Sequence, residues 1–194
     1  MKKCIICNQR KGNRFCSALE DNICSLCCGS KRQKEINCFM GCEYLKKGKD
    51  YQLTRQISKQ ISSTFRTESD DVFKNDEVVQ FVMPLERFFL ENFYYDKSVN
   101  DENIYNALVK IYSYQTKNID SLKADNRCEE LIFKTFNELS NAFPDMSEEL
   151  KSKSILRILR SIKTTSGGVF GNRNYLETVY SLFNEDGKWS HLFR

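Results

Sequence analysis

The stretch "ICSLCCGSKRQKEINCFMGCEYL", residues 23–45, holds five cysteines within 19 residues, and two of them are adjacent. Three more cysteines precede it, so eight of the nine lie between Cys4 and Cys42, and only Cys128 stands apart. Thiolates bind zinc in groups of four, and eight cysteines supply two such groups. Because disulfides are rare in a reducing cytosol, the clustering favours zinc over disulfides, with iron–sulfur clusters as a further alternative.

All eight clustered cysteines are predicted metal ligands, in the spacing Cys4-x2-Cys7-x8-Cys16-x7-Cys24-x2-Cys27-Cys28-x9-Cys38-x3-Cys42. Adjacent side chains of an extended stretch point in opposite directions, so Cys27 and Cys28 are expected to serve different ions. This favours an interleaved partition, with Cys4, Cys7, Cys24 and Cys28 on one ion and Cys16, Cys27, Cys38 and Cys42 on the other. A sequential partition, the first four and then the last four, is the alternative. Eight ligands leave no open coordination position on two ions, which predicts two structural zinc ions and no catalytic one.

The cysteine pattern also resembles known zinc modules. A C-x2-C pair, then "CSLCC" at residues 24–28, then a ligand pair spaced by three resembles the interleaved HIT and MYND zinc fingers, which mostly mediate protein–protein contacts. Those fingers usually have a histidine where Cys38 stands, and a complete second knuckle where this chain has only Cys16. The form C-C-G-x2-R…E-I-x-C-x3-C-x-Y-L also looks like the head of bacterial proteins of unassigned function with helical bodies. That resemblance implies an architecture and no activity.

The composition changes near Tyr51, from cysteine, glycine and lysine to apolar residues recurring every three or four positions. The predicted fold class is therefore a small di-zinc cysteine-rich module, residues 1–48, followed by an all-α helical bundle, residues 51–194, with a hinge at "GKD", residues 48–50. A polar segment of this length cannot fold on a hydrophobic core alone, and structural zinc contributes on the order of 10–16 kcal/mol. In the body we expect no strands, and helices at residues 51–65, 76–95, 100–115, 127–143, 145–163 and 174–183, with an Asp145-x-x-Glu148 capping box starting the fifth.

The formal net charge of +4 does not by itself indicate nucleic-acid binding. Residues 1–50 hold 11 Lys/Arg against 5 Asp/Glu, but two four-thiolate zinc sites would cancel four of those positive charges. A local basic rim is the remaining possibility, and its predicted partner-contact residues are Arg14, Lys31, Arg32, Lys34, Lys46 and Lys47. Solvated side chains that offset the thiolate charge are the competing interpretation.

Few side chains are suited to acid–base catalysis: the only histidine is His191, and the clustered cysteines are already assigned as structural zinc ligands. We therefore expect a non-enzymatic zinc-binding adaptor that docks a protein partner, with a nucleic-acid-binding regulator as the alternative. A small-molecule substrate is not expected. The start "MKKCIICNQR" lacks the apolar run of a secretory signal, and no stretch is long and apolar enough to span a bilayer. A cytoplasmic location without membrane contact is the resulting expectation.

Overall fold

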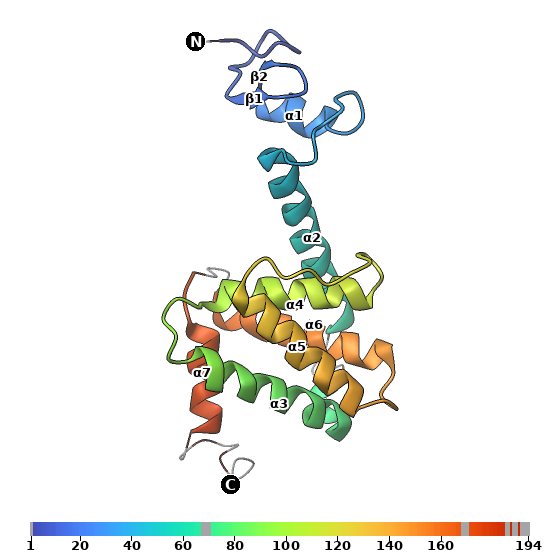
Figure 1. Ribbon diagram of the computed structural model, residues 1–194, viewed down its shortest axis with the longest axis vertical. Helices are drawn as coiled ribbons and strands as arrows, with labels where there is room; N and C mark the ends of the chain where they lie inside the picture. Colours follow the sequence, from blue (N-terminus) through green and yellow to red (C-terminus); the bar gives the residue numbers. More distant parts are fainter. Residues whose placement is uncertain (1, 67–70, 168–170, 185–186, 188–189, 191–194) are drawn as a thin grey trace. The chain divides into compact units, whose positions relative to one another are not determined.

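The computed structural model describes residues 2–66, 71–167, 171–184, 187 and 190. The chain divides into two compact units, an N-terminal unit of residues 1–58 and a helical unit of residues 59–194 (Figure 1). The division falls within a helix, and each unit is described by itself. Among the described residues, no helix combines the length and the apolar character that crossing a membrane requires.

The N-terminal unit is built from a short hairpin and a short helix. Strands β1 (Arg14–Cys16) and β2 (Asp21–Ile23) pair antiparallel, with Phe15 opposite Asn22. Helix α1 (Ser25–Lys31) follows directly. The two strands were not anticipated, because three residues are too few to show an alternating pattern. One buried cluster of this unit consists of four cysteines and two aliphatic side chains: Cys4, Ile23, Cys24, Cys27, Cys28 and Ile36. Leu45 and Ile57 are also buried.

The predicted hinge at residues 48–50 is wrong. Helix α2 runs without interruption from Glu43 to Thr64 and includes these residues. Gly48 instead leaves room for the side chain of Arg32, because a Cβ at position 48 would lie 1.6 Å from Nη1 of Arg32. Arg32 is held at that position by donating from Nε to the carbonyl of Cys28 (3.3 Å) and from Nη1 to the carbonyl of Tyr44 (2.9 Å). Glycine therefore allows an arginine to cross the first turns of α2.

In the helical unit every described element is helical, which confirms the all-α prediction for that part of the chain. The elements are η2 (Val72–Lys74), α3 (Asp76–Phe93), α4 (Asp101–Gln115), α5 (Arg127–Ala142), α6 (Glu148–Thr165) and α7 (Asn174–Phe183). Pro84 lies inside α3. The side chain that caps α6 is Ser147, which accepts from the N–H of Leu150, so the predicted capping box at Asp145 is wrong.

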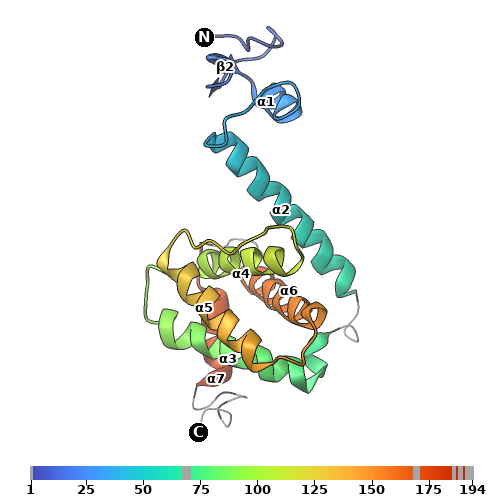
Figure 2. The same ribbon diagram turned by 45° about the vertical axis from the view of Figure 1, so that its right-hand side comes forward.

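The helical unit buries one apolar face of each of its main helices. Helix α4 packs against α5 and α6, and α3 packs against α5, α6 and α7 (Figures 1 and 2). Phe81 and Leu85 of α3, Leu108 of α4 and Ile155 of α6 are fully buried. The ring of Phe81 meets that of Phe136 edge to face at 6.2 Å. The predicted apolar stripes are the faces that form this core.

Helix α7 is held in place by residues from other helices. Its own N-cap residue, Arg173, makes no capping hydrogen bond. The buried carboxylate of Asp101, at the start of α4, accepts from the backbone N–H groups of Tyr175 (2.9 Å) and Leu176 (3.4 Å) instead. Arg173 donates to the carbonyls of Phe93 (3.0 Å) and Tyr94, at the end of α3. These contacts fix α7 against α3 and α4.

Candidate metal centre

Four cysteine sulfurs gather in the N-terminal unit. The sulfurs of Cys4, Cys7, Cys24 and Cys27 all lie within 4.8 Å of one another, and all but the half-buried Cys7 are buried. A tetrahedral zinc ion with bonds of about 2.3 Å separates its sulfur ligands by roughly 3.8 Å. The cluster is thus of a size that could hold one metal ion. All nine cysteines are free thiols, so the disulfide alternative finds no support here.

The first ligand pair, Cys4 and Cys7, lies on a tight turn of the kind that a C-x2-C knuckle forms. The N–H of Asn8 donates to the carbonyl of Cys4 (2.8 Å), and Asn8 takes a positive φ of 51° to close the turn. The N–H of Ile5 donates to the carbonyl of Asn22 (3.0 Å), which fastens the turn to β2. These backbone hydrogen bonds therefore hold the turn with Cys4 and Cys7 next to the hairpin.

The second ligand pair, Cys24 and Cys27, lies at the start of α1. Cys24 is the N-cap, and its sulfur accepts from the N–H of Cys27 at 3.4 Å. An N-cap residue and the third residue after it lie on the same side of a helix. The sulfurs of Cys24 and Cys27 are therefore close together, as those of Cys4 and Cys7 are. Both pairs are joined by the β1–β2 hairpin, which runs between them in the chain.

This geometry corrects the predicted partition. Cys27 completes the group with Cys4, Cys7 and Cys24, where the interleaved partition had placed Cys28. The group also differs from the sequential partition, since Cys16 lies outside it. The error came from treating residues 24–28 as extended. In a helix, neighbouring side chains are about 100° apart, and Cys24 then pairs with the residue three positions on.

The surroundings of Cys4, Cys7 and Cys27 shift the pKa values of their thiols. Burial raises the pKa of the Cys4 thiol, but the N–H groups of Cys7, Cys24 and Ile6 outweigh this and lower the pKa to about 6. The N–H groups of Arg10 and Gln9 lower the pKa of Cys7. The sulfur of Cys24, burial, and the sulfurs of Cys4 and Cys7 raise the pKa of Cys27 to about 12. Four thiolates this close repel one another, and a bound divalent cation would remove that repulsion.

The other four predicted ligands do not form a second such cluster among the residues that the structure describes. Cys16 ends β1, Cys28 lies in α1, and Cys38 and Cys42 lie between α1 and α2. Cys28 is buried in the same apolar centre, against which Cys16 and Cys38 pack. The four are therefore in one small unit, but their sulfurs are not gathered as those of the first group are.

Four of the six predicted rim residues already have partners within the chain. Arg32 donates hydrogen bonds to two backbone carbonyls, and the guanidinium of Arg14 lies 4.7 Å from the ring centre of Tyr44. The side chains of Lys31 and Lys47 pair with Glu35 and Glu43, each four residues away in the chain. Within the described parts of the chain, the side chains of Lys34 and Lys46 are exposed and have no hydrogen bond or ion pair.

Cys128, the ninth cysteine, is not an activated thiol. It is buried at the start of α5, and burial, with the nearby charges of Glu129 and Asp96, raises its pKa to about 11. A thiol that stays protonated is a poor nucleophile. His191 lies outside the described residues.

No family model, curated protein or solved structure matches this chain. The resemblance to HIT and MYND fingers therefore stays a prediction, and a function has to be inferred from the residues themselves.

Proposed function

We propose that this chain is a non-enzymatic, zinc-dependent adaptor protein of the cytoplasm. In this proposal a zinc ion on Cys4, Cys7, Cys24 and Cys27 is structural and holds the N-terminal unit in a rigid form. Support comes from the closure of the group, since four thiolates fill a tetrahedral zinc and leave no position for water or substrate. Only four aliphatic side chains among the described residues of this unit are buried, Ile23, Ile36, Leu45 and Ile57, so hydrophobic burial gives it little stabilisation of its own.

We extend the proposal to a second zinc ion on Cys16, Cys28, Cys38 and Cys42. These are the four thiols that the first group leaves over, and three of them already share one apolar centre. Thiolate zinc sites are formed as the metal binds, so ligand loops can close around the ion. Two ions would then link the hairpin, α1 and the start of α2.

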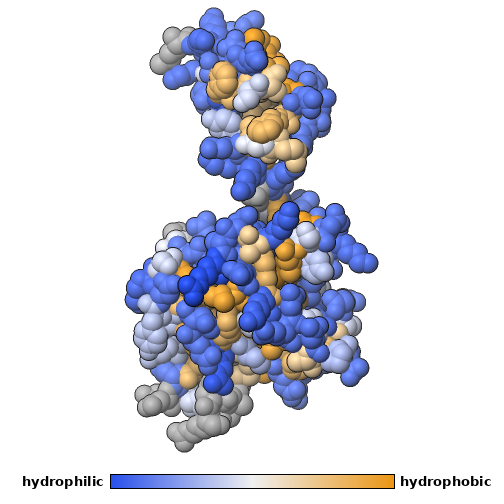
Figure 3. Space-filling view, in the orientation of Figure 1, coloured by the Kyte–Doolittle hydropathy of each residue, from blue (hydrophilic) through white to orange (hydrophobic). Residues whose placement is uncertain are grey.

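The observation that carries the adaptor role is the exposed apolar surface of the N-terminal unit. Seven large apolar side chains are exposed there, against two among the described residues of the helical unit. They are Ile5, Phe15, Leu19, Leu26, Phe39, Met40 and Tyr51, with Phe39 68% and Met40 70% exposed. Apolar side chains also reach the surface of this unit in Figure 3. A surface of this kind is typical of a protein-binding module.

The test is affinity capture with the full-length, zinc-loaded chain, with and without nuclease treatment. We expect a protein partner that nuclease and moderate salt leave in place. The double change Leu26→Ser and Phe39→Ser should abolish its capture, while Tyr95→Ser, a matched exposed residue of the helical unit, should not.

The same experiment tests the alternative, a nucleic-acid-binding regulator. Bound RNA or DNA that salt releases steeply, and that Lys34→Ala with Lys46→Ala eliminates, would favour that role and contradict the adaptor. Capture that is equal for the wild type and the Leu26→Ser, Phe39→Ser variant would also contradict the adaptor proposal.

A further inference from the structure

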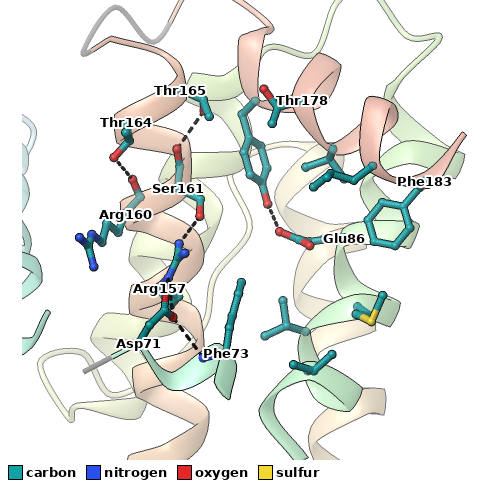
Figure 4. A pocket seen from close by; sticks show the side chains of 16 residues that line it. Asp71, Phe73, Glu86, Arg157, Arg160, Ser161, Thr164, Thr165, Thr178 and Phe183 are labelled. Carbon is teal, nitrogen blue, oxygen red and sulfur yellow. Dashed lines mark hydrogen bonds and ion pairs between the residues drawn. The ribbon is translucent and has the colours of Figure 1, made fainter. Parts of the chain in front are cut away.

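The helical unit contains a cavity of about 460 Å³ between η2, α3, α6 and α7 (Figure 4). Cavities that hold small organic ligands are typically about 300–1,000 Å³ in volume. Its wall on the α3 and α7 side is apolar, with Val82 and Met83 facing Val179 and Phe183. All of these residues belong to one compact unit, so the cavity does not depend on the N-terminal unit or on the proposed adaptor role.

One carboxylate, that of Glu86 on α3, lies within this apolar wall. Figure 4 shows its carboxylate beside Phe183, which also lines the cavity. The hydroxyl of Tyr175 on α7 donates to Oε1 of Glu86 at 2.8 Å. Among the described residues, the second oxygen, Oε2, has no hydrogen-bond donor and no ion-pair partner. A buried carboxylate in an apolar wall is costly unless a donor or a positive charge pairs with it.

The cationic side chains of the lining form no ion pair with Glu86, although the charge of Arg157 acts on it from a distance. Nε of Arg157 donates to both oxygens of Asp71, at 2.9 and 3.0 Å. Its guanidinium also stacks 4.7 Å from the ring centre of Phe73 and donates to the hydroxyl of Ser161. Arg160 points away from Glu86 (Figure 4), and its guanidinium lies over the ring of Phe65 at 5.4 Å.

The unmatched charge of the cavity is thus negative, and this decides the class of ligand. An anion would meet Glu86 and find Arg157 already neutralised by Asp71. A neutral alcohol could donate to Oε2 but would leave the charge uncompensated. A protonated amine can donate to Oε2 and also compensate the negative charge of Glu86. Its hydrogen bond to the carboxylate is charge-assisted and therefore stronger than one between neutral groups. The apolar wall would bury the rest of such a molecule.

We propose that this cavity binds a small amphiphilic amine, whose protonated nitrogen pairs with Oε2 of Glu86 and whose apolar body lies between α3 and α7. The sequence analysis did not predict this site, since it expected no small-molecule substrate. The exposed hydroxyl groups of Thr164, Thr165 and Thr178 donate to carbonyls of their own helices, and their oxygens remain able to accept from the amine.

The test is calorimetric titration of the full-length, zinc-loaded protein with octylamine, and with octanol and octanoate as probes of the same chain length. We expect saturable octylamine binding at roughly millimolar concentration or tighter, and binding of the other two at least tenfold weaker. Glu86→Gln should weaken octylamine binding tenfold or more. Glu91→Gln, an exposed change on the same helix, should leave it unchanged.

Glu86→Gln keeps an oxygen that can accept from Tyr175, and circular dichroism verifies that the variant folds. A second readout needs no variant: octylamine binding by the wild type should decline between pH 7 and pH 5 as Glu86 is protonated. The groups that face Glu86 are Tyr175 from α7, Arg157 from α6 and Asp71 beside η2. Equal binding of octanol or octanoate, unchanged affinity in Glu86→Gln, or no saturable octylamine binding would each overturn the proposal.

Discussion

The half-buried carboxyl group of Glu86 makes the stability of the helical unit depend on pH, and Glu86→Gln should remove that dependence. Burial in the wall between α3 and α7 raises the pKa of Glu86 from its usual 4.5 to about 6, although the hydrogen bond from Tyr175 and the charge of Arg157 act in the opposite direction. Folding therefore favours the protonated form. Glutamine is isosteric and cannot ionise, and its amide oxygen can still accept from Tyr175.

The magnitude follows from the shift in pKa. One pKa unit corresponds to about 1.4 kcal/mol, so a rise from 4.5 to about 6 corresponds to roughly 2 kcal/mol. Because the pKa is higher in the folded state, this contribution is fully present below pH 4.5 and is lost as the pH rises through about 6. Above about pH 7 the wild type should lack it entirely, whereas Glu86→Gln should not lose stability in this window through position 86.

The assay is urea denaturation of both proteins, followed by far-ultraviolet circular dichroism, at intervals from pH 4.5 to pH 7.5. Every other titrating group, the nine cysteines included, is common to both proteins, so the difference between the two free energies of unfolding isolates Glu86. We expect that difference to change by about 2 kcal/mol in favour of Glu86→Gln as the pH rises. A difference that stays constant across the range would refute this account of Glu86.

Three further predictions concern other parts of the chain. Asp101→Ala should lower the free energy of unfolding by roughly 2–3 kcal/mol, because it leaves the N–H groups of Tyr175 and Leu176 without their acceptor; a loss below about 0.5 kcal/mol would mean that water replaces the carboxylate. Iodoacetamide at pH 8 should label Cys128 only after unfolding, since its thiol is buried with a pKa of about 11, and rapid labelling of the native chain would contradict that burial. A strong chelator should make residues 1–45 sensitive to proteolysis while most of the helical circular dichroism remains; an unchanged cleavage pattern after verified metal removal would argue against a metal-built unit.

The helices of the body could be predicted because their signals are local. Apolar residues at helical spacing and capping residues such as Asn100 lie next to one another in the chain, and α7 begins and ends where its pattern does. The start of α6 was placed too early because Asp145 and Ser147 are both good capping residues. Only the backbone geometry decides that Ser147 accepts the hydrogen bond.

The errors in the N-terminal unit arose from contacts between distant residues. Gly48 has the composition of a hinge, but its lack of a side chain serves Arg32, 16 positions earlier. The adjacent pair Cys27 and Cys28 was assigned on extended geometry, while the chain is helical there and Cys27 pairs with Cys24. Neither fact can be obtained from spacing alone.

The cavity was missed for a similar reason, although the sequence contains one usable signal. Glu86 falls on the apolar stripe of α3, four residues after Val82 and three before Phe89, and both of those side chains are buried. A carboxylate on such a face is a candidate for a buried functional group. Its partner Tyr175 lies 89 residues away, so only the packing of α7 on α3 brings the two together.

The central claim, that thiolate-bound zinc takes the place of a hydrophobic core in residues 1–58, is tested most directly by counting metal ions. Native mass spectrometry of the untagged wild type and of Cys27→Ser gives the number of zinc ions per folded chain. We predict two ions in the wild type and one in Cys27→Ser, with the N-terminal unit of the variant open to protease. A wild type that is folded without metal, or a Cys27→Ser protein that keeps the full count, would contradict the claim.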